Sequence, residues 1–272
     1  MPDPEALDVF LFSDFGWADP YAGQMRANIV RLCVPGARLG RIIDVTHGIA
    51  RGDVLAGAAQ IAASLPYLPA PSVVVAVVDP GVGTGRRALA CRSTGGAVLI
   101  GPDNGLFSMV EVPEAWLLPG SRESCSSTFH GRDLFAVAAA GVCSAGSYLE
   151  SLEPIDPGAL VTLHKPVPRR VGGSVECLVA WTDSFGNVVL WADRASIPDV
   201  AEGLLELPDG RAPIPYRLSG TYSGGKGLLL LEGSQGLMEL ALDGGSASEA
   251  TGLAAGDSLA LRGLEPSGRA RR

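Results

Sequence analysis

The chain has 272 residues, of which 47% are hydrophobic and 18% charged, a composition typical of a folded protein and too apolar for a disordered one. The net charge of −8 gives no basic surface for nucleic acid, and no run of about 18 apolar residues predicts a membrane span. The five cysteines form no CxxC pair, and the first residues lack the features of a secretion signal. We therefore expect a cytoplasmic protein with no metal site, no membrane and no nucleic-acid partner.

The first 165 residues alternate between short apolar runs and helical stretches. Helices are expected at about 20–34, 53–65 and 132–146, with Asp53 well placed to cap the second. Strands are expected at the runs LDVFLF, GRIIDVTH, SVVVAVVD, ALACRS and AVLIGPD. Strands that are apolar on both faces and alternate with helices predict an α/β domain with a mainly parallel sheet covered on both sides.

The character of the chain changes near residue 170. The segment LHKPVPRRVGG has the prolines and glycines of a linker, and dense turn signals follow it. The runs SVECLVAW, NVVLWAD, PIPYRLSG, GLLLLEG, LMELAL and DSLALRG are typical of short antiparallel strands in a small barrel or sandwich. We expect an N-terminal α/β domain over 1–165, a linker over 166–172 and a C-terminal antiparallel β-barrel domain over 173–272.

Polar side chains follow several strands of the expected α/β domain. Ligands of open α/β sheets bind beyond the carboxyl ends of the strands, so we look for a site at this edge. The residues that end these strands are Ser13, Asp14, Asp19, Asp44, His47, Asp79, Asp103 and Asn104.

The stretch VVDPGVGTGRR places Asp79 and Arg86 at the two ends of a glycine-rich loop, directly after a buried strand. It lacks the GK[ST] sequence of a phosphate-binding loop and does not fit GxGxxG. Taken alone, the stretch is explained either by a structural turn or by an acid and a guanidinium that together hold a reactive water.

Three other polar residues are candidates, and two of them have an alternative structural interpretation. Asp14 lies between a strand and a helix, where a carboxylate can accept both hydroxyls of a ribose, and Asp19 is either a second such acid or a helix cap. His130, in STFHGRDLF, belongs to a polar motif before a helix or is a core histidine bound by a backbone group.

Six motifs in order, FSDFG, DPGVGTGRR, GPDNGL, TFHGRD, TDSFGN and GSQGLMELA, resemble the S-adenosylmethionine hydroxide adenosyltransferase family over residues 8–262. This family is related to fluorinase and chlorinase. The resemblance implies a hydrolase without a cofactor that converts S-adenosylmethionine to adenosine and methionine, through attack of water or hydroxide on C5′ of the ribose. It also implies a homotrimer, with each active site between the N-terminal domain of one subunit and the C-terminal domain of its neighbour.

The resemblance implies roles for individual residues. Asp79, Arg86 and His130 match the family's Asp-Arg-His triad, which positions the attacking water. The matched substrate contacts are Asp14 for the ribose hydroxyls, Asp183 and Asn187 for the methionine amino group and the adenine edge or ribose, Ser234 for the methionine carboxylate, and Tyr222 for stacking on adenine. Gln235 stands where the fluorinase has an arginine.

Two positions differ from the halogenases. A tyrosine stands there in place of Asp79, and the halide-binding serine of the fluorinase aligns with Gly131, although the chlorinase also has glycine. A carboxylate repels a halide, and no hydroxyl remains to replace its hydration. A halogenase is thus disfavoured. A non-catalytic binder of S-adenosylmethionine or adenosine is the other alternative, and it has no use for a water-activating triad.

Overall fold

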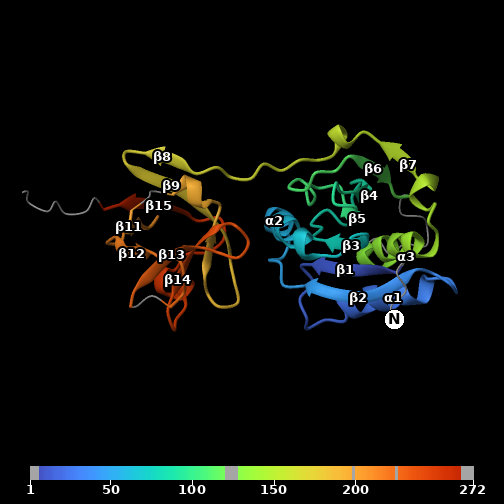
Figure 1. Ribbon diagram of the computed structural model, residues 1–272, viewed down its shortest axis with the longest axis horizontal. Coiled ribbons are helices and arrows are strands. Elements are labelled where there is room, and N and C mark those ends of the chain that lie inside the picture. The colour runs from blue at the N-terminus through green and yellow to red at the C-terminus, as the bar shows by residue number, and fades with distance from the viewer. Residues whose placement is uncertain (1–5, 120–127, 198–199, 224–225, 265–272) are drawn as a thin grey trace, which may run out of the picture. The chain divides into compact units, whose positions relative to one another are not determined.

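The computed structural model describes residues 6–119, 128–197, 200–223 and 226–264, and the chain forms two compact units, Met1–His164 and Lys165–Arg272 (Figure 1). Each unit has its own sheet and its own hydrophobic core. The segment expected as a linker, 166–172, contains the short strand β8 (Arg169–Val171), which pairs with the next strand.

The sheet of the first unit has seven strands within the described residues, in the order β2-β1-β3-β5-β4-β6-β7. Strands β2, β1, β3 and β5 are parallel neighbours, and β4, β6 and β7 add antiparallel strands at one side. The expected α/β domain with a mainly parallel sheet is thereby confirmed. The strands are β1 (Leu7–Ser13), β2 (Leu39–Thr46), β3 (Ser72–Val77), β4 (Ala88–Arg92), β5 (Val98–Pro102), β6 (Glu114–Leu117) and β7 (Glu153–Ile155).

Helices cover both faces of this sheet. Successive strand side chains point to opposite faces, so the two faces form separate cores. Val9 and Val75 pack in a core with α1 and α3, whereas Phe10 and Val74 pack in a second core with α2. Asp53 caps α2 as expected, its carboxylate accepting a hydrogen bond from a backbone amide. The helices are α1 (Tyr21–Leu32), α2 (Val54–Ser64), η1 (Leu65–Tyr67), the π-helix η2 (Gly131–Phe135), α3 (Ala136–Ser144), η3 (Leu149–Ser151) and η4 (Pro157–Ala159).

The second unit is a closed β-barrel, also as expected. Its strands follow the order β10-β14-β13-β12-β11-β15-β9, the ring closes through pairing of β9 with β10, and β8 extends from β9. Pairing is antiparallel except between β12 and β13, which are parallel. The elements are β9 (Ser174–Thr182), β10 (Val188–Leu190), η5 (Arg194–Ser196), β11 (Glu202–Glu206), β12 (Ile214–Leu218), β13 (Leu228–Glu232), β14 (Met238–Leu242), α4 (Ala247–Thr251) and β15 (Ser258–Gly263).

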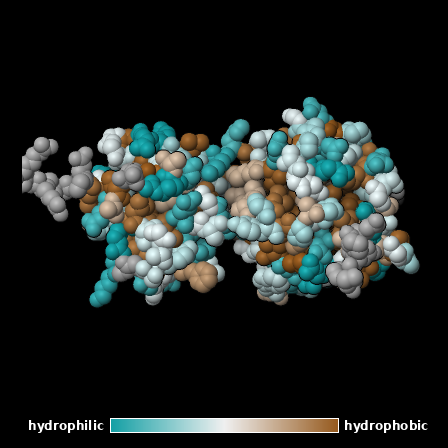
Figure 2. All heavy atoms as spheres, viewed as in Figure 1, coloured by the Kyte–Doolittle hydropathy of each residue, from teal (hydrophilic) through white to brown (hydrophobic). Residues whose placement is uncertain are grey.

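Hydrophobic side chains reach the surface of both units, where brown spheres lie among teal ones in Figure 2. Two large exposed rings lie in or next to the motifs singled out in the sequence: Trp17, directly after FSDFG, is 66% exposed, and Phe185, in TDSFGN, is 81% exposed. In the part of the chain that the structure describes, no helix is both long and apolar enough to cross a membrane.

Candidate active site

Asp14 and Asp79 follow neighbouring parallel strands of the first unit. Strand β1 pairs with β3 in register, with Ser13 opposite Val77, so both acids emerge at the same edge of the sheet. Burial raises the pKa of Asp14, and the nearby carboxylate of Asp79 adds a smaller increase. The two acids therefore share one site at the carboxyl ends of the strands.

The glycine-rich loop returns Arg86 to Asp79. Turn hydrogen bonds run from Val82 N to Asp79 O (3.2 Å), and Gly83 has φ +79°, a conformation that side-chain-bearing residues rarely adopt. The guanidinium of Arg86 then grips the Asp79 carboxylate with two nitrogens, Nε lying 2.7 Å from Oδ1 and Nη2 contacting Oδ2. The loop thus builds a bidentate ion pair, the strongest geometry for such a pair.

His130 joins this pair from a distant part of the chain, immediately before η2. Its Nδ1 lies 2.9 Å from Nη2 of Arg86. The side chains of Asp79 and Arg86 are only 5% and 9% exposed, and the guanidinium carbon of Arg86 lies 5.3 Å from the ring centre of Phe135. Asp79, Arg86 and His130 therefore form one contiguous, mostly buried cluster.

The contact with Arg86 decides the protonation of His130. A guanidinium has only donors, so Nδ1 must accept the hydrogen bond and the imidazole must be neutral, with its proton on Nε2. Burial lowers the pKa of His130, and the positive charge of Arg86 lowers it further. At neutral pH His130 therefore presents an N–H donor from Nε2.

Asp14 is held by the loop after β2. Its Oδ2 accepts a hydrogen bond from the backbone amide of Gly52 (2.8 Å), while burial raises the pKa of the carboxyl group. Gly131 lies against Phe15, the residue after Asp14, and a Cβ added there would come 3.0 Å from the Phe15 ring and 3.1 Å from the Phe129 ring. A serine at position 131, as in the fluorinase pattern, would require these rings to move.

A hydrogen-bond chain begins at Ser13, next to Asp14, and sequence reasoning missed it by interpreting His47 as a strand end. Ser13 Oγ is 2.6 Å from His47 Nδ1, and His47 Nε2 is 3.1 Å from Asp44 Oδ1. The backbone amide of Phe15 donates to Ser13 Oγ (3.2 Å). Ser13 and His47 are both fully buried, so this chain fixes the backbone on either side of Asp14 and does not meet a substrate.

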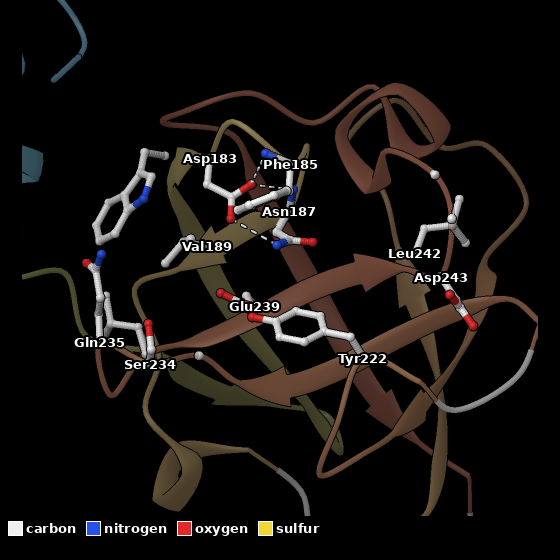
Figure 3. A pocket seen from close by; sticks show the side chains of 15 residues that line it. Asp183, Phe185, Asn187, Val189, Tyr222, Ser234, Gln235, Glu239, Leu242 and Asp243 are labelled. Carbon is white, nitrogen blue, oxygen red and sulfur yellow. Dashed lines mark hydrogen bonds between the residues drawn. The ribbon is translucent and has the colours of Figure 1, made fainter.

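The second unit contains a pocket of about 560 Å³ (Figure 3). Asp183, Asn187, Tyr222 and Ser234, all matched to substrate contacts, line it together with Gln235. These residues come from the turns after β9, before β13 and before β14, which the barrel brings to one place.

Asp183 organises its own turn. Its Oδ1 accepts hydrogen bonds from the backbone amides of Phe185 and Asn187 (2.9 Å each), and its Oδ2 accepts one from Asn187 Nδ2 (2.9 Å). This leaves the carbonyl oxygen of the Asn187 side chain unused within the turn. Figure 3 shows these bonds as dashed lines above Tyr222.

Glu239 is a second carboxylate of this pocket that sequence reasoning missed. It is 6% exposed, and its Oε1 accepts a hydrogen bond from the hydroxyl of Tyr222. That bond and burial raise the pKa of Tyr222 to about 12, and burial also raises the pKa of Glu239. The pocket therefore has acidic and aromatic walls.

The predicted site residues fall into two groups. The first unit holds Asp14, Asp79, Arg86, His130 and Gly131, and the second unit holds the remaining four. Within the described ranges, no cluster of His, Cys, Asp and Glu side chains could hold a metal ion.

Comparisons with known proteins match each of the two units to a family domain. Residues 9–153 match the SAM hydroxide adenosyltransferase N-terminal domain, and residues 177–260 match the C-terminal domain. The chain is 38% identical over 261 residues to an (R)-S-adenosyl-L-methionine hydrolase of Salinispora arenicola, covering 91% of this chain and 94% of that relative. A hydrolase with the same name from Thermus thermophilus is 36% identical, with 91% and 96% covered.

Two solved structures are also similar. A conserved protein from Thermotoga maritima is 26% identical with a TM-score of 0.81, covering 94% of this chain and all of that one. A protein from Thermus thermophilus is 32% identical with a TM-score of 0.68, with 94% and 99% covered. The chain belongs to the SAM hydroxide adenosyltransferase family.

Proposed function

We propose that the protein is a hydrolase that converts S-adenosyl-L-methionine and water to adenosine, L-methionine and a proton. The observation that carries this proposal is the contiguous cluster of Asp79, Arg86 and His130 beside Asp14. Relatives covering nine-tenths of the chain are named as hydrolases of this substrate, which supports it.

The chemistry requires little acid catalysis. Water attacks C5′ of the ribose as the bond from C5′ to the sulfonium sulfur breaks, and the electron pair of that bond leaves with sulfur. Methionine is thus a neutral leaving group. Because positive charge disappears from sulfur during attack, a site that excludes water favours the transition state.

The cluster has a role for each member. His130 offers its Nε2 proton to the water oxygen, because Arg86 occupies Nδ1. Asp79 is then the group that accepts a hydrogen bond from the attacking water and, as the C–O bond forms, its proton. Arg86 fixes both neighbours and stabilises hydroxide character on the water.

Asp79 also supports hydrolysis over halogenation. A buried carboxylate at the nucleophile position repels chloride or fluoride. Incubating the protein with S-adenosylmethionine, with and without concentrated chloride, and identifying the nucleosides by mass spectrometry tests this. Adenosine is expected in both cases, and a 5′-halo nucleoside as the main product would overturn the proposal.

A homotrimer, with each active site completed by a neighbouring subunit, is part of the proposal. The division of the expected substrate contacts between two compact units supports it, since neither unit alone holds all of them. Sedimentation should give three times the chain mass. Mixing Asp79→Asn subunits with Asn187→Ala subunits under exchange conditions should restore activity. If the mixed oligomers recovered no activity, active sites shared between subunits would be contradicted.

The free thiols at the four described cysteines support a cytoplasmic location, which stays a prediction.

A further inference from the structure

The pocket of the second unit has negative charge without a matching positive residue. Asp183, Glu239 and Asp243 line it, and no lysine, arginine or histidine is among its described lining. Asp183 lies near enough to raise the pKa of Glu239. A pocket with this charge selects a ligand that brings a cation.

The Glu239 carboxylate is prepared for a hydrogen-bond donor. Tyr222 holds Oε1, whereas Oε2 accepts no hydrogen bond from the described residues. Glu239 Oε2 occupies space that a side chain at position 233 would fill, since a Cβ added to Gly233 would lie 2.4 Å from this oxygen. Figure 3 shows Glu239 beside the Tyr222 hydroxyl, with Asp183 and Asn187 on the other side of the same space.

We infer that Glu239, held by Tyr222, is a further carboxylate that binds the α-ammonium group of the substrate's amino-acid portion, in addition to Asp183, to which the family resemblance assigns this group, and so makes the pocket selective for ligands that carry it. The inference rests on the proposed function for the identity of the substrate. S-adenosylmethionine has two cationic groups, a sulfonium and an ammonium. Only the ammonium has N–H donors, which the open oxygen of Glu239 requires.

The test compares ligands with and without the ammonium group, using the full-length protein and titration calorimetry. S-adenosylhomocysteine and methionine carry the ammonium, and adenosine does not. Glu239→Gln should weaken binding of the first two by about tenfold to a hundredfold, the range for a lost hydrogen bond to a charged group, and leave adenosine within about twofold. It should also raise KM for S-adenosylmethionine.

Glu249→Gln is the matched control. It makes the same chemical change at an exposed residue of the same unit that does not line the pocket, so it should change none of these affinities by more than about twofold. The inference would be overturned if Glu239→Gln weakened the binding of adenosine as much as that of S-adenosylhomocysteine, or if it left the binding of S-adenosylhomocysteine unchanged.

The wild-type protein gives a second measurement that does not depend on a variant folding. Protonation of Glu239 removes its charge, and burial raises its pKa above the ordinary 4.5, so affinity for S-adenosylhomocysteine should begin to fall on acidification while the pH is still above 4.5. Asp183 and Tyr222 are the titratable groups that face Glu239 among the described residues, and Tyr222, with its pKa of about 12, stays protonated. Adenosine affinity should stay constant, and a parallel fall for both ligands would contradict the inference.

The experiments distinguish a failure of the inference about Glu239 from a failure of the proposed hydrolase function. Wild-type protein that binds S-adenosylhomocysteine through Glu239 but releases no adenosine from S-adenosylmethionine would refute the hydrolase alone. Normal hydrolysis with no preference for the ammonium group would refute the role of Glu239 alone.

Discussion

Replacing Asp79 by asparagine removes one negative charge from the Asp79–Arg86–His130 cluster while preserving the size of the side chain. Asparagine offers a single acceptor oxygen, so Arg86 loses one of its two bonds and keeps an uncompensated charge. General-base catalysis is typically worth about 10² to 10⁴-fold, so kcat should fall by that factor, equal to roughly 3 to 5 kcal/mol in the barrier. KM should change by less than about threefold.

The same substitution should also affect stability. Breaking a buried ion pair costs about 3 to 5 kcal/mol, which lowers Tm by roughly 6 to 20 °C in a unit of this size. Kinetics should therefore be measured at 25 °C, in single turnovers, with circular dichroism to verify folding.

Asp103→Asn is the matched control for Asp79→Asn. Asp103 has a 2% exposed side chain, lies at the same edge of the sheet and accepts a hydrogen bond from Arg87 Nε (2.6 Å), outside the cluster. Asp103→Asn should lose less stability, because the Arg87 side chain is 38% exposed, and it should keep kcat within about threefold. Wild-type kcat in folded Asp79→Asn, or an equal loss of kcat in Asp103→Asn, would refute the catalytic role of the cluster.

Three further predictions concern ribose binding, the protonation of His130 and metal independence. Asp14→Ala should raise the dissociation constant for adenosine by about tenfold, because a hydrogen bond to a charged group is lost, and should affect kcat less. A large loss of kcat with unchanged adenosine affinity, measured by kinetics and calorimetry, would contradict ribose binding by Asp14. Burial holds the pKa of His130 below its usual 6.5, so its neutral form should sustain kcat at neutral pH. Both kcat and the free energy of unfolding should decline only as the pH falls below about 6.5, where this histidine takes up a proton more readily in the unfolded chain than in the folded one. A kcat that rises on acidification would contradict the assigned protonation. Exhaustive chelation should leave turnover unchanged, and a loss restored by one particular divalent ion would contradict a metal-free mechanism.

The sequence predicted the helices of the first unit well because their signals are local. The expected bounds of α1 and α2 lie within two residues of those observed, and Asp53 supplied the capping signal. Strands β6, β7 and β11 were missed, since the sequences EAWL, EPI and EGLLE carry glutamate, proline or glycine and no clear alternation. The parallel pairing of β12 and β13 depends on barrel closure, which a local pattern does not encode.

The candidate site was predictable in part for a similar reason. Asp79 and Arg86 lie seven residues apart, so the loop itself suggested their contact. His130 arrives from 44 residues further along, and only the family resemblance connected it to Arg86. Glu239 alternates with the core residues Met238 and Leu240 on β14, a pattern that is typical of a solvated side chain, yet Tyr222 covers it.

The most direct test of the account is a reaction of S-adenosylmethionine with the protein in water enriched in heavy oxygen, followed by mass spectrometry of every product. If water attacks C5′ at the Asp79–Arg86–His130 cluster, adenosine should carry one heavy oxygen, in its 5′-hydroxyl, and methionine should carry none. Formation of labelled homoserine together with methylthioadenosine would contradict the account, and so would adenosine that carries no label.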